Sequence, residues 1–309
     1  MASTFLGFPA AKASPRLDAD IAILGAPHAT PYRTDQSPCA GAPAALRERI
    51  GRQADKLAHH DFDLGGPLLG DEGDIRVVDC GDLSCDPTDA DGNRERIAGA
   101  VDAILNAGAV PIVLGGDDSV VIPVVAGFKA HGPVCVVQVD AHIDWRDEVN
   151  GIRHGYSSPM RRASEMPWVT GMIQVGLRGV GSARRAELDD ALAWGSHIVT
   201  AREIHQSGIE TALRHIPEGA RCFITIDCDG LDPSVIPAVV APAPGGLTYW
   251  QVVDLIHGIA ERAQIAGMDL VEFAPGLDPN GHAALAAARL VSNTIGTVAR
   301  AAGEKAADT

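Results

Sequence analysis

The stretch Val139-Asp140-Ala141-His142-Ile143-Asp144 joins the end of an apolar run to two carboxylates and one imidazole at alternating positions. Side chains at positions i and i+2 of a strand lie on the same face, so a strand through this stretch presents Asp140 and His142 together. Where the strand opens into a loop, Asp144 can fold back towards the same point. The stretch therefore predicts a buried strand that delivers metal ligands at its carboxyl end.

The same pattern recurs in Ile224-Thr225-Ile226-Asp227-Cys228-Asp229-Gly230-Leu231-Asp232-Pro233, where a β-branched run leads into acidic residues and a turn closed by Pro. Asp227 and Asp229 fall on one face of this strand. A single Asp-x-Asp is weak support for a metal, because acidic turns commonly follow strands. Two such clusters in one chain, each after an apolar run, favour a two-metal site.

A third strand end is predicted in Val113-Leu114-Gly115-Gly116-Asp117-Asp118-Ser119, where two glycines allow a tight turn. Asp and Ser are favoured at helix N-caps, so capping of the following helix is the simpler interpretation for Asp117 and Ser119. We assign Asp118 to the metal site.

A fourth strand end lies in Met268-Asp269-Leu270-Val271-Glu272-Phe273-Ala274-Pro275 and places Glu272 where a buried strand meets a Pro-containing loop. One carboxylate can bind a planar cation through two parallel hydrogen bonds. Glu272 is therefore a candidate clamp for such a cation.

Short apolar runs alternate with helical patterns along the whole chain. This alternation predicts a mostly parallel sheet covered by helices on both faces, with ligands bound at the carboxyl ends of the strands. We expect one domain over residues 1–309, with a frayed tail at 303–309. The predicted strands are Ile21–Leu24, Ile75–Val78, Val110–Leu114, Val134–Val139, Met172–Val175, Cys222–Ile226 and Met268–Val271. The predicted helices are Asn93–Asn106, Val120–Lys129, Ala183–Trp194, Tyr249–Arg262 and His282–Ala301.

The amino-acid composition restricts the classes of binding partner and the cellular compartment that we expect. The formal net charge of −15 argues against nucleic acid or an anionic membrane as the main partner, and is compatible with cationic ligands. The six cysteines are scattered without metal or disulfide spacing, which is typical of a reduced, cytoplasmic protein. No apolar run reaches the roughly 18 residues of a membrane span, and the N-terminus lacks a secretory pattern.

Taken together, these motifs resemble those of the ureohydrolase family, the arginase and agmatinase group, and more closely its agmatinase-like branch. The resemblance covers nearly the whole chain. It implies a three-layer α/β/α fold, two divalent ions, most typically manganese with nickel or cobalt as alternatives, and hydrolysis of a guanidinium carbon to urea and an amine. The motifs that carry it are Ile23–Pro27, Gly41–Arg47, Gly115–Ser119, Asp140–Asp144, Asp227–Pro233 and Asp269–Glu272.

The resemblance also implies roles for single residues. Asp144 would orient the attacking hydroxide, and Glu272 would hold the guanidinium so that its carbon faces the attack. Two carboxylates would bridge the ions and two further pairs would complete them: Asp140 and Asp227 as bridges, Asp118 with Asp144 on one ion, and His142 with Asp229 on the other.

The chain departs from the family pattern at Asp118, where the family usually has His after Gly-Gly-Asp. Only one imidazole, that of His142, then remains in the site. Oxygen-rich sites favour Mn, Mg or Ca over Zn, so we expect metal to bind with altered affinity, metal preference or pH optimum. The alternative is a site that has lost one ion.

A second departure lies in Gly151–Ala163, where the family has His-Gly-Thr-Pro-Phe before Arg-Arg-Ala. His154-Gly155 matches by identity, whereas aligning Arg-Arg-Ala places Tyr156 at the position of the catalytic histidine. We favour His154 as the proton shuttle, because a pKa near 6.5 suits neutral operation better than the value near 10 of Tyr. Tyr156 is then a substrate contact.

The loop after Asp144 carries both charges and leaves the substrate open. Arg146 or Arg153 would receive a carboxylate tail, as in guanidinobutyrate, and Asp147 or Glu148 the ammonium of agmatine, the family default. Free or alkylated guanidine would need neither.

Two other functions are alternatives to the hydrolysis of a guanidino compound. A catalytically weak paralogue would support an active partner subunit, although five of the six expected ligands are unchanged. A deacylase on a related scaffold fits poorly with the clamp at Glu272. The resemblance further implies a homo-oligomer, a trimer or hexamer, and a small cationic guanidino substrate.

Overall fold

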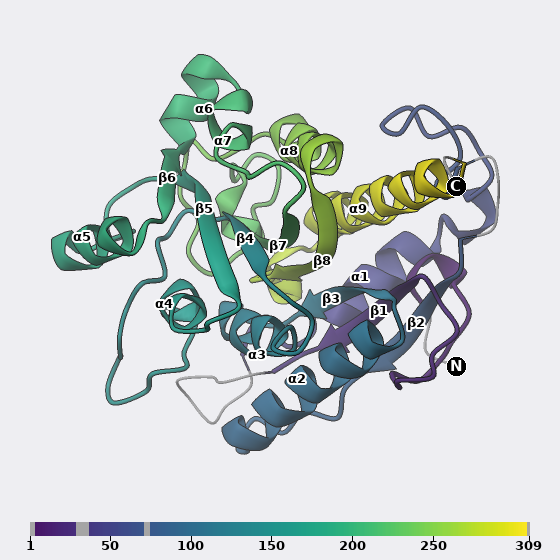
Figure 1. The fold of residues 1–309 in the computed structure, drawn as a ribbon, viewed down its shortest axis with the longest axis horizontal. Coiled ribbons are helices and arrows are strands. Elements are labelled where there is room, and N and C mark those ends of the chain that lie inside the picture. The colour runs from purple at the N-terminus through teal and green to yellow at the C-terminus, as the bar shows by residue number, and fades with distance from the viewer. Residues whose placement is uncertain (1–3, 29–36, 71–74, 308–309) are drawn as a thin grey trace.

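The computed structural model describes residues 4–28, 37–70 and 75–307 (Figure 1). One eight-stranded sheet has the order β2-β1-β3-β8-β7-β4-β5-β6, and every neighbouring pair is parallel. The strands are β1 (Ile21–Ala26), β2 (Val77–Asp82), β3 (Val110–Gly115), β4 (Val134–Val139), β5 (Val169–Leu177), β6 (His197–Thr200), β7 (Arg221–Asp227) and β8 (Gln264–Val271).

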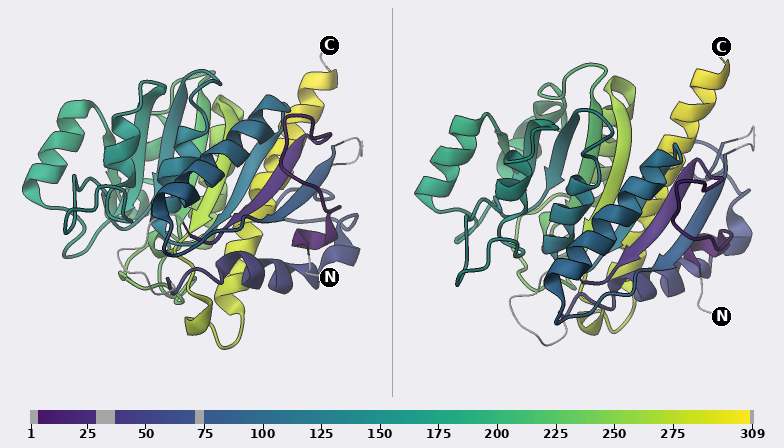
Figure 2. Two further views of the ribbon diagram at one scale, coloured as in Figure 1. Left: turned by 90° about the horizontal axis from the view of Figure 1, so that it is seen from below. Right: turned by 60° about the horizontal axis from the view of Figure 1, so that its bottom comes forward.

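Helices cover both faces of the sheet (Figure 2). The α-helices are α1 (Ala42–Gly51), α2 (Ala90–Asn106), α3 (Val121–Ala126), α4 (Pro159–Ser164), α5 (Arg185–Trp194), α6 (Ala201–Ser207), α7 (Glu210–Leu213), α8 (Tyr249–Arg262) and α9 (His282–Ala307). The 3-10 helices are η1 (Phe5–Gly7), η2 (Ala54–Lys56), η3 (Asp118–Val120), η4 (Cys228–Gly230) and η5 (Pro275–Leu277).

The two faces bury separate cores because successive strand side chains point in opposite directions. In β1, Ile21 and Ile23 belong to the core that also contains residues of α1 and α6–α9, whereas Ala22 and Leu24 belong to the core that contains residues of α2–α5. The strands consequently read as continuous apolar runs, as parallel strands buried on both faces do. The predicted parallel sheet with helices on both faces is confirmed.

Most predicted elements are present, and α8 has the predicted bounds. The helix predicted over Val120–Lys129 is wrong in its bounds: the 3-10 turn η3 covers Asp118–Val120, and α3 ends at Ala126. Strand β6 and helices α1, α4, α6 and α7 were not among the predicted elements. Helix α9 includes residues 303–307, residues 308–309 lie outside the described part, and the frayed tail stays a prediction.

Helix α1 is fixed to the sheet edge by a buried ion pair. Arg47 donates from Nε to Asp79 Oδ2 over 2.8 Å and from Nη2 to Asp79 Oδ1 over 2.9 Å. Both side chains are buried, and Asp79 also accepts the backbone N–H of Phe5 over 2.7 Å. The pair thereby joins the N-terminal segment, α1 and β2.

The last strand in sequence, β8, lies in the middle of the sheet, between β3 and β7. The carboxyl ends of β3, β8, β7 and β4 are therefore neighbours.

Within the described ranges, no helix combines the length and apolar character needed to cross a bilayer.

Candidate metal centre and catalytic cavity

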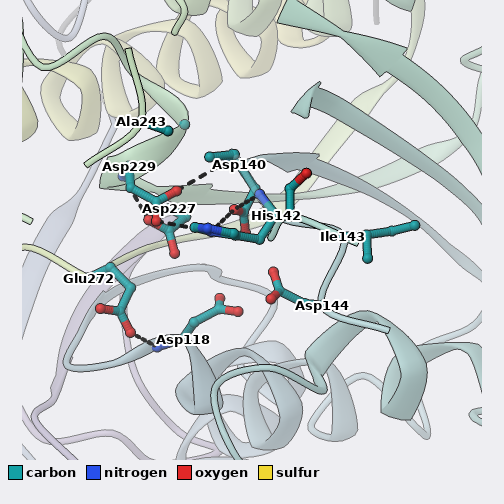
Figure 3. A network of polar contacts seen from close by, with 12 residues as sticks. Asp118, Asp140, His142, Ile143, Asp144, Asp227, Asp229, Ala243 and Glu272 are labelled. Atoms are coloured by element: carbon teal, nitrogen blue, oxygen red, sulfur yellow. Dashed lines mark hydrogen bonds and ion pairs between the residues drawn. The ribbon is translucent and has the colours of Figure 1, made fainter. Parts of the chain in front are cut away.

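Four neighbouring strand ends bring the predicted metal ligands and Glu272 together (Figure 3). They surround a cavity of about 610 Å³. Its polar lining includes Cys39, Asp117, Asp118, His142, Asp144, Arg146, Tyr156, Glu187, Asp227, Asp229 and Glu272. Asp140 lies beneath this lining and is fully buried.

Aspartates hold the turns that follow the strands. Asp117 Oδ1 accepts the N–H of Ser119 over 3.1 Å, which confirms its capping role and leaves the neighbouring Asp118 to face the cluster. Asp227 Oδ1 accepts the N–H of Asp229 over 2.7 Å at the start of η4. Such side-chain bonds to the backbone two residues on are characteristic of Asp in turns.

Two groups of three side chains are close enough to share a cation. Asp140, His142 and Asp229 form one group, and Asp118, Asp140 and Asp144 form the other. Within each group the candidate ligand atoms lie within 4.8 Å of one another. Asp140 belongs to both, which is the arrangement a bridging ligand needs.

Asp227 lines the cavity but belongs to neither of these groups in the described part of the chain. The grouping of the other five residues follows the division that the family resemblance implied. Their assignment as ligands stays a prediction.

The electrostatics of the cluster fit divalent cations. Burial, and then the charges of neighbouring carboxylates, raise the pKa values of Asp118, Asp144 and Asp227 well above the ordinary range. Hydrogen bonds to Asp140 and Asp229 raise the pKa of His142 to about 11. Asp118 Oδ2 is buried without a hydrogen-bond partner among the described residues. An oxygen-rich donor set of this kind suits Mn²⁺ or Mg²⁺.

Two of the four residues other than glycine that have positive φ in the described part of the chain belong to this site. Asp144 has φ of 46° and Glu272 has φ of 61°, in the left-handed region that side-chain-bearing residues rarely adopt. Such conformations persist only where the surrounding structure holds them, and they cluster at functional sites. The Glu272 N–H donates to the Gly116 carbonyl over 2.9 Å. A Cβ atom on Gly116 would lie 2.0 Å from the Pro27 carbonyl oxygen, so this close approach requires glycine.

Glu272 faces the metal-ligand candidates from the end of β8. Its Oε1 accepts the N–H of Asp118 over 2.9 Å, and its Oε2 lies 3.5 Å from the thiol sulfur of Cys39. Burial, and then the charge of Asp117, raise the pKa of Glu272 to about 8. The cysteine contact was not expected from the sequence.

The loop after Asp144 contributes some predicted residues to the cavity and not others. Arg146 and Tyr156 line it, and Glu187, which was not predicted, lies with its Oε1 3.6 Å from Arg146 Nε. Asp147 lies outside the lining and pairs with Arg162 at 2.7 Å and with Arg153 at 3.0 Å.

His154 also lies outside the cavity lining. Burial, and then the positive charge of Arg94, lower its pKa below the usual value. The structure thus brings Tyr156 to the cavity and leaves His154 outside its lining, so the shuttle role of His154 stays a prediction.

Known proteins resemble this chain in sequence and in fold. The profile of the arginase family matches residues 19–296. An N(1)-aminopropylagmatine ureohydrolase of Thermus thermophilus is 38% identical over 204 residues, covering 64% of this chain and 66% of that relative, just under two thirds of its length. A guanidinobutyrase of Pseudomonas aeruginosa is 30% identical over 223 residues, covering 70% of this chain and 69% of that relative.

Among solved structures, proclavaminate amidino hydrolase from Streptomyces clavuligerus superposes with a TM-score of 0.84 and 25% sequence identity. The superposition covers 97% of this chain and 98% of that chain. The similarity therefore runs through the whole sheet.

Proposed function

This chain belongs to the arginase family, and from that membership we propose that it is a binuclear-metal amidinohydrolase that cleaves a small guanidino compound to urea and an amine. The observation that carries the proposal is the pair of candidate cation groups that share Asp140, with the carboxylate of Glu272 across the same cavity. A guanidinium is resonance-stabilised and a poor electrophile, so its hydrolysis needs both an activated water and a fixed orientation.

We assign the two ions to Asp118, Asp140, His142, Asp144, Asp227 and Asp229, with manganese the first expectation and nickel or cobalt the alternatives. A pair of divalent ions supplies water activation and charge neutralisation when bound. Five carboxylates and one imidazole suit hard cations better than zinc.

Glu272 would bind the guanidinium through both carboxylate oxygens and fix the direction of attack. The Asp118 N–H at its Oε1 and the Cys39 thiol at its Oε2 hold the carboxylate in one orientation, which supports this role. Asp144 would accept a proton from the attacking water, because its carboxylate lies in the Asp118–Asp140 group. Positioning of this kind can supply a large share of a rate enhancement.

Proton delivery to the leaving amine has two candidates. The pKa of an imidazole favours His154, whereas the cavity lining favours Tyr156. We expect Tyr156→Phe to lower kcat at least tenfold and His154→Gln to change it less than twofold, since proton transfer by a placed side chain typically contributes about 10²-fold or more. The reverse pattern would assign the shuttle to His154.

The lining also favours a second class of substrate, a guanidino acid. In the loop after Asp144, Arg146 reaches the cavity, where Glu187 lies 3.6 Å from it. Asp147 is engaged by two arginines outside the cavity. Agmatine would instead place its ammonium near Glu187. The guanidinobutyrase relative supports the first arrangement and the aminopropylagmatine ureohydrolase the second.

The test is urea release from a panel of guanidines by protein reconstituted separately with Mn²⁺, Ni²⁺, Co²⁺ and Zn²⁺. The panel contains agmatine, guanidinobutyrate, guanidinopropionate, arginine, methylated guanidines and free guanidine. Turnover of one compound would name substrate and metal. Silence across the panel, with far fewer than two ions bound, would favour a supporting role beside a paralogous subunit.

The domain organisation, the assembly and the cellular location of the protein stay predictions. We propose a single domain, assembly as a trimer or hexamer and a cytoplasmic location, on the family membership and the composition. Nucleic acid and membrane surfaces are not proposed partners, because the chain is strongly acidic.

A further inference from the structure

A row of buried polar side chains crosses the sheet directly beneath the metal-ligand candidates. Gln138 on β4 is in register with Gln174 on β5 and with Thr225 on β7, and Thr225 is in register with Asp269 on β8. Residues in register on neighbouring strands point to the same face of a sheet. The row is completed by Ser196, which precedes β6, and all five side chains are buried.

Three of these five side chains form a continuous chain of hydrogen bonds that ends on the cluster. The Ser196 hydroxyl donates to Gln174 Oε1 over 2.8 Å. Gln174 Nε2 donates to Gln138 Oε1 over 2.6 Å and to the Ile143 carbonyl over 2.8 Å. Gln138 Nε2 then donates to Asp140 Oδ2 over 2.7 Å and to Asp144 Oδ2 over 2.9 Å.

The direction of each amide is set by its partners. The Ile143 carbonyl can only accept, so it requires the nitrogen of the Gln174 amide and turns the oxygen of that amide to the Ser196 hydroxyl. Gln138 must then turn its oxygen to Gln174 and its nitrogen to the carboxylates. A flipped Gln138 would press a carbonyl oxygen against two carboxylates, which the surrounding bonds prevent.

We propose that Gln138 is a positioning residue that fixes the carboxylates of Asp140 and Asp144 for cation binding, and that Gln174 and Ser196 hold its amide in the required orientation. This inference rests on the proposed function, because Asp140 is the shared member of both cation groups and Asp144 the proposed proton acceptor. No motif of the sequence marked these three residues.

A neutral amide suits this task better than a cation would. Its two N–H groups stabilise two like charges that lie side by side, and each takes up one oxygen of a different carboxylate. An Arg or Lys in the same place would neutralise the cluster and compete with the metal. The amide leaves the net negative charge in place for the ions. It also restrains Asp144, whose backbone is in the left-handed region.

The decisive experiment compares Gln138→Met with Thr225→Val. Met nearly preserves the volume of Gln and removes both donors, whereas Thr225→Val removes a hydroxyl from the same buried row. Among the described residues, Thr225 makes no hydrogen bond to a ligand carboxylate, so its variant reports any general effect of altering the row. The readout is Mn²⁺ affinity, measured by competition with a fluorescent chelator, together with Mn²⁺ content by elemental analysis.

We expect Gln138→Met to weaken Mn²⁺ binding 10- to 100-fold, the usual effect of removing a group that orients ligands. Thr225→Val should stay within about threefold of wild type by the same comparison. Wild-type affinity in Gln138→Met, or equal losses in both variants, would overturn the proposal. The measurement needs no turnover, so it is independent of whether the proposed substrate is correct.

A milder variant covers the case in which Gln138→Met does not fold. Ser196→Ala removes only the far end of the chain and leaves Gln138 in place. The Gln174 amide then loses the donor to its oxygen, and Mn²⁺ affinity should fall by a smaller factor, about 2- to 10-fold, below the usual range. No change in affinity would show that the orientation of Gln138 does not depend on this chain.

Discussion

In the metal-free protein, the free energy of unfolding should fall as the pH rises through neutrality. Three buried groups set the minimum size of this effect, and the raised pKa values of Asp118, Asp144 and Asp227 act in the same direction. Burial raises the pKa values of Asp269 and Glu272 to about 8, and hydrogen bonds to its carboxylate neighbours raise that of His142 to about 11. Without cations, the folded protein keeps protons on these groups at pH values where the unfolded chain has released them.

The sign and size follow from proton linkage. Between pH 6.5 and 7.5 the unfolded chain has lost the two carboxyl protons and is losing that of His142, whereas the folded protein retains all three. Each proton that the folded protein retains and the unfolded chain has released lowers the free energy of unfolding by about 1.4 kcal/mol per pH unit. Because the unfolded His142 is only partly deprotonated in this interval and the two folded carboxyls begin to titrate near its upper end, the three groups together lower it by about 3 kcal/mol. That is a large part of a typical total of roughly 5–15 kcal/mol.

The measurement is urea denaturation at pH 6.5, 7.0 and 7.5, with chelator and with saturating Mn²⁺. Metal should reverse the trend, because cation binding requires deprotonated ligands and strengthens as pH rises. Asp269→Asn, which removes one of the three groups without touching a candidate ligand, should reduce the slope by about 1.4 kcal/mol per pH unit. A chelated protein whose stability is flat or rises over this interval would refute the reasoning.

Three further substitutions test other parts of the molecule. Asp118→His adds a second imidazole and should shift metal preference from Mn²⁺ towards Ni²⁺ or Zn²⁺ in competition assays; an unchanged preference would remove Asp118 from the ligand set. Glu272→Gln should lower kcat/KM by about 30-fold to several thousandfold, the effect of breaking a buried charged pair worth roughly 2–5 kcal/mol, with metal content unchanged; a loss below fivefold would contradict the clamp. Arg47→Met leaves the buried Asp79 uncompensated and should lower the free energy of unfolding by about 3–5 kcal/mol in urea; a loss below 1 kcal/mol would mean that Asp79 finds other partners.

The central strands were predictable because burial on both faces leaves an apolar run that local sequence displays directly. Strand β6 was missed since it is short, lies at the sheet edge and begins with an exposed His197. The helix over Val120–Lys129 was drawn too long because its apolar residues belong to a 3-10 turn followed by a short α-helix packed on the sheet. Secondary-structure propensity alone cannot distinguish one long α-helix from a 3-10 turn followed by a short α-helix.

The candidate ligands were predictable for a different reason, since each follows a strand at a spacing that local geometry converts into a shared direction. The residues that support them were not. In the sequence, Gln138 is only a polar residue within an apolar strand. Cys39 contacts Glu272 although the two residues are 233 positions apart in the sequence. The positive φ at Glu272 also has no local signature. Such features depend on partners that only the folded chain brings together.

The central place of β8 has a consequence for how the protein is made. Strands β2, β1 and β3 on one side and β7, β4, β5 and β6 on the other share no pairing except through β8, which the ribosome synthesises last. A nascent chain that ends before Gln264 therefore exposes two unpaired edges, on β3 and β7, in separate half-sheets. Unpaired edges are prone to aggregation. Truncation of the chain before β8 should thus yield insoluble protein rather than a smaller folded unit, and metal cannot rescue it, because Glu272 and the closure of the site arrive with the same strand.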